Sequence, residues 1–182
     1  MIRHKLQTAI DKRASLLNVS TDALRLIDGE GDGLPGLYLD TLAGRWLVST
    51  TASELDTEVL TWLKGQGDKG RTIYWKQLDQ HEKTNPTHIA GPSQDEAFII
   101  KESGVDYLID FQSGYSQGIF LDQRLNRQRV RAHSKHGTTV LNTFAYTGAF
   151  SVCAALAGAT TTTLDLSQVY LDWARNHFSI ND

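Results

Sequence analysis

The stretch "TTVLNTFAYTGAFSVCAALAG", residues 138–158, decides the fold class of this chain. Its first half is apolar and β-branched, and the segment from Val140 to Phe144 predicts a strand buried within a parallel sheet. Gly148 then marks a tight turn, and the small residues behind it predict a helix that packs closely on the sheet. A strand that runs into a helix in this way is typical of parallel α/β sheets.

Strands and helices alternate on both sides of this stretch. Residues 120–135 predict a helix, residues 160–167 a strand rich in threonine, and residues 168–182 another helix. Such alternation indicates a parallel sheet with crossover helices. We therefore expect residues 113–182 to form one domain of the α/β class.

The residues before this domain show a different pattern. An amphipathic helix is expected over residues 3–18, and short strands follow it. A second helix is expected over residues 53–65, with Ser53 as its N-cap and Gly65 as its end. Strands mixed with few helices indicate an α+β domain over residues 1–112.

Two segments near the end of this first domain carry turn signals. Residues 97–111 predict two strands around a tight turn at Ser103 and Gly104. Residues 78–96 are polar and contain two prolines, so we expect them to form an exposed loop.

The composition is that of a soluble globular chain. It has 182 residues, of which 40% are hydrophobic and 21% charged, and a net charge of -3, which argues against strong general affinity for nucleic acid but is compatible with a local basic face. Cys153 is its one cysteine, so no internal disulfide and no thiolate metal cluster are expected. The six histidines are scattered, and we expect no metal site.

Targeting signals are not evident in the sequence. No apolar run approaches the roughly 20 residues that a membrane helix needs. The first residues, "MIRHKLQTAIDKR", do not have the apolar stretch of a secretion signal. The expected location is the cytoplasm, with no membrane partner.

The loop behind the first sheet strand is the candidate ligand site. Ligands of open α/β sheets lie at the carboxyl ends of the strands, where Gly148 allows close backbone approach and Thr147 offers a hydroxyl. Asp165 lies 19 positions after Tyr146, close to the spacing of about 20 at which nucleotide-binding folds place an acid on ribose hydroxyls. These features favour a nucleoside-type ligand. The alternative is that Gly148 only makes a turn and Asp165 only caps a helix.

The stretch "LNTFAYTGAFSVCAALAGATTTTLDLSQVYLDWARNHFSIND" resembles motif I through the second helix of class I S-adenosylmethionine-dependent methyltransferases. The resemblance is to the bacterial ribosomal RNA large-subunit methyltransferases that modify cytosine at C5. Three further segments, "RLIDGEGDGLPGLYLD", "ESGVDYLIDF" and "GIFLDQRLNR", follow the same family in the same order. The resemblance covers nearly the whole chain. It implies a Rossmann-like methyltransferase domain, S-adenosyl-L-methionine as cofactor, and a base of RNA, in ribosomal RNA processing, as acceptor.

The resemblance also implies roles for individual residues. The loop residues should surround the methionine part of the cofactor, Asp165 should accept from its ribose hydroxyls, and Arg124 should pair with its carboxylate. Ser167 and Gln168 are expected near the adenosine. The implied cofactor-binding residues are Phe144, Tyr146, Thr147, Gly148, Asp165, Ser167, Asp122, Gln123 and Arg124.

The chain departs from the pattern of this family in two places. The relatives usually begin with an RNA-binding PUA domain and continue with a D-P-P-type loop and a catalytic cysteine, and neither is present. We therefore expect a truncated chain that is inactive alone, with an uncovered sheet edge through which it self-associates. Cys153 lies among small apolar residues and is expected to pack in the core, not to act as nucleophile.

Three arginines suggest an RNA contact. Arg124, Arg127 and Arg131 are spaced for one face of a helix, and we expect Arg127 and Arg131 to contact RNA phosphates. The alternative for these side chains is an ordinary solvated face.

Other functions remain open from the sequence. A methyltransferase with another acceptor is one alternative, and a noncatalytic binding module related to methyltransferases is a second. A nicotinamide-dependent enzyme is a third, although the G-x-G-x-x-G fingerprint is missing.

Overall fold

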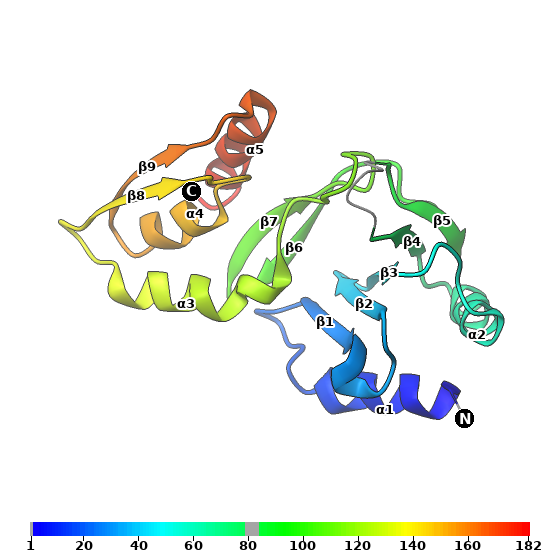
Figure 1. The fold of residues 1–182 in the computed structure, drawn as a ribbon. Coiled ribbons are helices and arrows are strands. Elements are labelled where there is room, and N and C mark those ends of the chain that lie inside the picture. Colours follow the sequence, from blue (N-terminus) through cyan, green and yellow to red (C-terminus); the bar gives the residue numbers. More distant parts are fainter. Residues whose placement is uncertain (1, 79–83) are drawn as a thin grey trace. The chain divides into compact units, whose positions relative to one another are not determined.

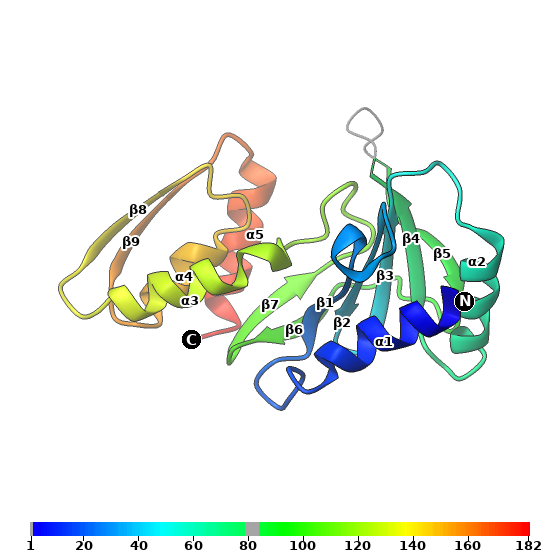
Figure 2. The same ribbon diagram turned by 60° about the horizontal axis from the view of Figure 1, so that its bottom comes forward.

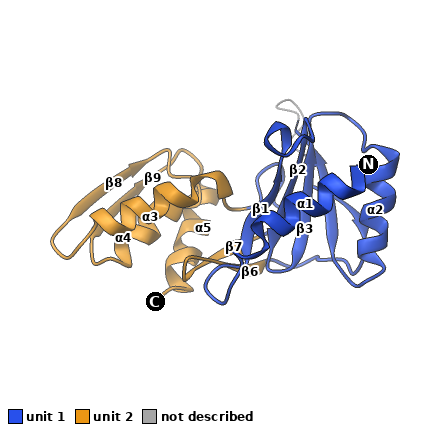
Figure 3. Ribbon diagram, turned by 90° about the horizontal axis from the view of Figure 1, so that it is seen from below, with its two compact units in different colours: residues 1–97, 110–117 blue, residues 98–109, 118–182 orange. Residues whose placement is uncertain are grey.

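The computed structural model describes residues 2–78 and 84–182 of the chain. They divide into two compact units, coloured separately in Figure 3. The first unit consists of Met1–Ala97 and Asp110–Gln117, and the second unit consists of Phe98–Ile109 and Gly118–Asp182.

The hairpin at Phe98–Ile109 belongs to the second unit, whereas the sequence pattern placed it in the domain of residues 1–112. Compactness does not by itself show which segments fold independently. The domain division at 1–112 and 113–182 therefore stays a prediction.

The first unit is one mixed sheet with two helices. Its strands follow the order β1-β2-β3-β4-β5, with β3 and β4 parallel and the other neighbours antiparallel. Figure 2 shows α1 lying across the sheet, and side chains from both helices share one core with β1, β2 and β3. The elements are α1 (Ile2–Ala14), β1 (Ala23–Asp28), the 3-10 helix η1 (Gly29–Asp32), β2 (Leu37–Leu42), β3 (Arg45–Thr50), α2 (Thr57–Gly67), β4 (Ile73–Gln77) and β5 (Thr87–Ala90).

Three elements of this unit differ from expectation. Helix α1 ends at Ala14 and not at residue 18, and helix α2 ends at Gly67 and not at Gly65. Helix α2 begins at Thr57 because Asp56, and not Ser53, is its N-cap; the Asp56 carboxylate accepts from two backbone amides of the first turn. Strand β5 lies in the segment that was expected to be a loop. Its polar residues suit an edge strand with one neighbour, β4. Residues 79–83 of the same expected loop lie outside the described residues.

A half-buried lysine holds Asp110–Gln117 to the rest of the first unit. The Lys76 ammonium on β4 donates to the Tyr115 carbonyl at 2.8 Å and to Gln117 Oε1 at 2.7 Å. The Phe111 ring packs on Tyr74 with centroids 4.5 Å apart. These contacts explain why this short segment groups with a sheet that ends 20 residues earlier in the chain, at β5 (Thr87–Ala90).

The second unit combines a hairpin with a parallel strand pair. Strands β8 and β9 run parallel in the register Thr139↔Thr160 to Thr143↔Leu164, and α4 connects them as the expected crossover helix. Figure 1 shows α4 beside β8 and β9, and Figure 3 colours α3, α4 and α5 as parts of the same unit. Its elements are β6 (Phe98–Glu102), β7 (Val105–Ile109), the 3-10 helix η2 (Leu121–Gln123), α3 (Arg124–His133), β8 (Thr139–Thr143), α4 (Ala149–Ala155), β9 (Thr160–Leu164) and α5 (Gln168–Ser179).

One face of the β8–β9 pair is covered and the other is open. Asn142 and Thr163 both contact the Ser151 hydroxyl of α4, at 2.9 and 2.8 Å. On the opposite face Leu141 and Leu164 are 65% and 58% exposed. The expectation of a fully buried strand is therefore wrong for the described chain, because helices cover these strands from one side only.

Within the described part of the chain, none of the helices has the length and apolar character needed to cross a membrane.

Candidate functional site

The loop between β8 and α4 has an unusual backbone. Phe144 and Tyr146 have φ of 55° and 51°, and Gly148 has 71°. A left-handed conformation costs a non-glycine residue roughly 1–2 kcal/mol, so the surrounding contacts must hold this loop in place. Strained backbone of this kind concentrates at ligand sites.

Asp165 is the residue that holds this loop against the next strand. Its Oδ2 accepts from the Tyr146 amide at 2.8 Å, and its Oδ1 accepts from the Ser167 amide at 2.9 Å. The Ala145 amide also donates to the Leu164 carbonyl at 3.1 Å. Each carboxylate oxygen can accept more than one hydrogen bond, so both retain capacity for a ligand hydroxyl.

A segment just before η2 completes the loop's surroundings. The Gly118 amide donates to the Tyr146 hydroxyl at 2.9 Å, and the Thr147 hydroxyl donates to the Gly118 carbonyl at 2.6 Å. The Tyr146 ring lies against Phe120 and Tyr170, with centroids 5.1 and 4.6 Å away. The sequence pattern did not single out Gly118 or Phe120, because nothing in the local sequence shows that they return to this loop.

Thr147 differs from expectation. It is fully buried, and its hydroxyl is bonded to Gly118. The side chain therefore anchors the loop to Gly118, whereas the sequence suggested that the hydroxyl faces a ligand.

Gly148 is required by both conformation and space. It precedes α4 with a left-handed φ, and a Cβ atom at this position would lie 2.8 Å from the Ala174 Cβ. A side chain here would therefore separate the loop from α5, so the close packing of the buried Gly148 on Ala174 requires a glycine.

The remaining loop candidates lie at the rim of the site. Phe144 is 89% exposed. Ser167 is the N-cap of α5 and accepts from the Tyr170 amide at 3.4 Å. Gln168 is exposed and donates to Asp172 one turn further along α5. Phe144 follows β8, and Asp165 and Ser167 follow β9. All three therefore lie at the carboxyl ends of these two strands.

The candidates of the η2–α3 junction form a local cluster. Gln123 donates to Asp122 Oδ2 at 2.7 Å and accepts from Asn126 at 2.9 Å. Arg124 is the first residue of α3. The residues of this region that contact the loop are, in the described chain, Gly118 and Phe120. The cofactor roles expected for Asp122, Gln123 and Arg124 stay predictions.

The prediction that Arg127 contacts RNA needs correction. Arg127 is 2% exposed, and its guanidinium donates to both oxygens of Glu102, at 2.7 and 2.8 Å, and to the Phe120 carbonyl at 2.9 Å. Arg131 of the same helix is half-buried and donates to the Ser103 carbonyl. This face of α3 packs on the β6–β7 hairpin, so it is neither a solvated face nor open to RNA at Arg127.

Cys153 is buried in α4, with its sulfur 3.1 Å from the Tyr107 hydroxyl. Burial raises the pKa of the Cys153 thiol. A protonated, enclosed thiol is a poor nucleophile, which agrees with a packing role. Among the described residues, no cluster of three or more His, Cys, Asp or Glu side chains suits a metal ion.

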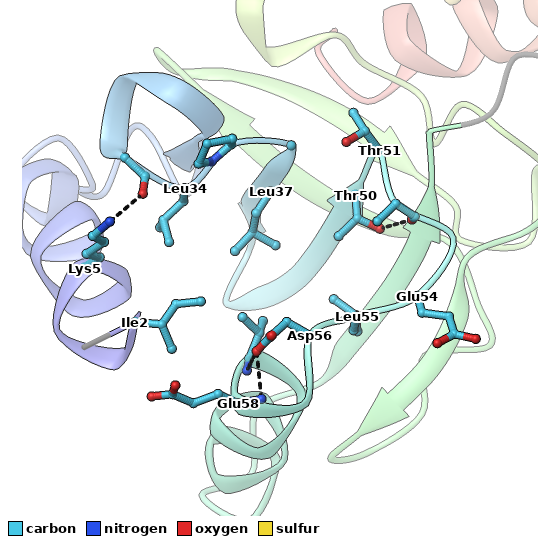
Figure 4. Close-up of a pocket in the computed structure, with 15 residues that line it drawn as sticks. Ile2, Lys5, Leu34, Leu37, Thr50, Thr51, Glu54, Leu55, Asp56 and Glu58 are labelled. Atoms are coloured by element: carbon cyan, nitrogen blue, oxygen red, sulfur yellow. Dashed lines mark hydrogen bonds between the residues drawn. The ribbon is translucent and has the colours of Figure 1, made fainter.

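A separate cavity of about 500 Å³ opens in the first unit (Figure 4). Aliphatic side chains line its floor and charged ones its rim: Ile2, Leu34, Leu37, Leu55 and Val59, with Lys5, Glu54, Asp56 and Glu58. The Lys5 ammonium donates to the Gly33 carbonyl at 3.0 Å. Three carboxylates and one ammonium line this cavity, a charge balance that does not favour RNA phosphates.

The fold and the loop define the class of protein. A strained loop lies at the carboxyl ends of two parallel strands, and an aspartate joins the loop to the second strand, an arrangement that is typical of nucleoside-binding sites in α/β proteins. A model of the S-adenosylmethionine-dependent methyltransferase family matches residues 25–182. The chain belongs to this family, whose cofactor is S-adenosylmethionine.

Similar proteins are consistent with this assignment. The chain is 37% identical to the ribosomal RNA large-subunit methyltransferase YwbD assigned in Bacillus subtilis, over 97% of this chain and 47% of that protein. It is 33% identical to ribosomal RNA large-subunit methyltransferase I of Alteromonas mediterranea, over 97% of this chain and 46% of that protein. The chain thus spans about half the length of the curated relatives it matches.

A solved structure supports the Rossmann-like fold class. It is that of a protein assigned as a methyltransferase and solved with S-adenosylhomocysteine bound, and it is similar to this chain with a TM-score of 0.86 and 32% identity. The similarity covers 98% of this chain and 47% of that one. The α/β fold class is therefore confirmed.

Proposed function

We propose that this chain carries the S-adenosylmethionine site of a methyltransferase that acts on a base of large-subunit ribosomal RNA. The observation that carries the proposal is the Asp165 carboxylate, which joins the loop after β8 to the start of α5 and keeps lone pairs for a ribose. The names of the relatives supply the acceptor class. Cytosine C5 is the acceptor position that the resemblance favours.

The residues present fit this cofactor. Asp165 accepts from the ribose hydroxyls, and the loop backbone at Tyr146–Gly148 faces the methionine part, since Gly148 adds no side chain there. Phe144, whose ring is exposed at the rim of the site, contacts the methionine part, and Ser167 lies near the adenosine. Arg124 pairs with the methionine carboxylate, for which a guanidinium is well shaped.

The role of this chain in catalysis is to place the two reactants. Methyl transfer from a sulfonium proceeds by in-line attack, so holding the donor in a fixed orientation lowers the barrier. Cys153 does not supply a nucleophile, because its thiol is buried against Tyr107. RNA is the partner and the cytoplasm the location in this proposal, and Arg131 remains a candidate for RNA contact.

A calorimetric titration with S-adenosylhomocysteine, with NAD as competitor, tests the cofactor assignment. We expect saturable binding of one ligand that NAD does not displace. Binding of NAD in preference to S-adenosylhomocysteine would contradict it.

The acceptor is tested separately by transfer of a labelled methyl group from S-adenosylmethionine to unmodified large-subunit ribosomal RNA, using the whole natural protein. Label in the RNA supports the proposal, and cofactor binding without transfer supports a noncatalytic module.

A further inference from the structure

His177 is a buried histidine that the proposed function does not use. It lies on α5, is 0% exposed, and has a carbonyl oxygen beside each ring nitrogen. Nδ1 is 2.9 Å from the Thr147 carbonyl, and Nε2 is 3.3 Å from the Leu108 carbonyl. Both neighbours are acceptors, and a neutral imidazole carries only one N–H.

The surroundings indicate which nitrogen carries the proton. The Leu108 carbonyl already accepts from the Trp173 indole N–H at 3.1 Å, and the contact to Thr147 is the shorter one. The titratable group that faces the ring is Tyr107, edge-on with centroids 5.4 Å apart, and its hydroxyl contacts Cys153. The geometry therefore favours a neutral His177 that donates from Nδ1 to Thr147.

The Thr147 carbonyl belongs to the peptide group that sets the shape of the loop. This peptide joins Thr147 to Gly148, and Thr147 itself lies between two residues with left-handed φ, Tyr146 and Gly148. Its N–H, from Gly148, donates to the Ala145 carbonyl at 2.9 Å, and its carbonyl accepts from His177. The peptide plane is thus held at both ends. Loss of either bond would free a strained peptide to rotate.

We infer that His177 is a positioning residue for S-adenosylmethionine, which acts by fixing the Thr147–Gly148 peptide from beneath the cofactor loop. The inference rests on the proposed function for its ligand. His177 itself is separated from the ligand side of the loop by Thr147, so its effect on affinity passes through the backbone.

Two amide variants test this inference as a matched pair. In His177→Asn the side-chain N–H₂ takes the place of Nδ1 and can still donate to Thr147. In His177→Gln it takes the place of Nε2 and reaches toward Leu108 instead. Both variants remove the ring, so their common loss of packing cancels in the comparison. We expect His177→Gln to weaken S-adenosylhomocysteine binding by about tenfold, and His177→Asn by less than about threefold. Equal affinity of the two variants would overturn the inference.

Amide hydrogen exchange provides a readout that does not depend on the cofactor. The Gly148 and Tyr146 amides should exchange faster in His177→Gln than in His177→Asn. Trp173→Phe, which removes the indole bond to Leu108 but not the bond to Thr147, is the control and should leave both amides protected. If the natural chain binds no S-adenosylhomocysteine, the proposed function fails, whereas unchanged exchange in His177→Gln removes the role of His177 itself.

Discussion

At the scale of single residues, Asp165 links two separate segments of the second unit through its carboxylate. Its two oxygens hold the amides of Tyr146 and Ser167, which belong to segments on either side of β9. Asp165→Ala should therefore both loosen the loop and remove the acceptor for the ribose. We expect the affinity for S-adenosylhomocysteine to fall by at least about tenfold, because hydrogen bonds to a charged group contribute about 1.5–3 kcal/mol. Calorimetry measures the change.

Asp172→Ala is the control for this substitution. Asp172 is an exposed carboxylate on α5 that contacts Gln168 and Arg175 of the same helix. Its removal should leave the affinity unchanged. Equal losses in the two variants would show that the effect of Asp165 is general and not due to its place in the loop.

His177 makes the stability of the second unit depend on pH. Burial lowers the pKa of His177 from its ordinary value of 6.5. The unfolded chain therefore takes up a proton at this residue at a higher pH than the folded chain does, so stability is full above pH 6.5 and falls as the pH drops toward the folded pKa. The slope from this residue is at most about 1.4 kcal/mol per pH unit. Urea unfolding between pH 7.5 and 5.5 measures it, with His177→Asn as the comparison. An identical slope in His177→Asn would contradict this account.

The sequence marked individual residues of the loop, but it did not show which distant residues they contact. Asp165 and Gly148 were singled out because spacing and backbone freedom mark them, and their roles toward the cofactor stay predictions. The burial of Thr147 and Arg127 was missed, since their partners Gly118 and Glu102 are 29 and 25 residues away in the chain. No local pattern encodes such contacts.

At the scale of elements, the bond between α3 and the β6–β7 hairpin depends on the buried pair of Arg127 and Glu102. Glu102→Gln leaves the guanidinium without its charge partner. Breaking a buried pair from one side typically costs about 3–5 kcal/mol, and we expect a loss in this range in urea unfolding. The double variant Glu102→Leu, Arg127→Met should lose less, because no uncompensated charge remains.

The neighbouring pair of Lys101 and Asp106 is the control for the hairpin. Lys101 Nζ and Asp106 Oδ1 are 3.5 Å apart, and both side chains are partly exposed. Lys101→Met should cost no more than about 1 kcal/mol, as for other surface pairs. A loss as large as that of Glu102→Gln would mean that burial is not the source of the effect.

Elements with strong periodic or turn signals were predicted well, and elements defined by neighbours were not. The β6–β7 hairpin has its turn at Ser103 and Gly104 as expected, and both have positive φ. Strand β5 was missed because its residues are polar, and only its pairing with β4 makes it a strand. The start of α2 was misplaced because Ser53 and Asp56 are both good N-caps, and local sequence does not decide between them.

At the scale of the whole molecule, the open face of β8 and β9 should make this chain self-associate. Leu141 and Leu164 lie in the same exposed face of the strand pair. Contiguous apolar surface of this kind promotes association. Sedimentation velocity should show a mass that rises with concentration, and Leu141→Thr with Leu164→Thr should reduce it. Leu125→Thr, a control on α3 that is 57% exposed, should not. A monomer at all concentrations would contradict the prediction.

The family could be predicted from sequence because several separate segments follow it in order, and the family comparison confirms it over residues 25–182. The acceptor base, by contrast, was expected from the resemblance alone, because Cys153 is buried and has the surroundings of a packing residue.

The central claim is that S-adenosylmethionine binds at the carboxyl ends of β8 and β9. Mapping of amide chemical shifts in the ¹⁵N-labelled chain during titration with S-adenosylhomocysteine tests it most directly. We predict saturable shifts that are largest at Tyr146, Gly148 and Ser167. Saturable shifts confined to the first unit, or no saturable shift at these amides, would contradict the account.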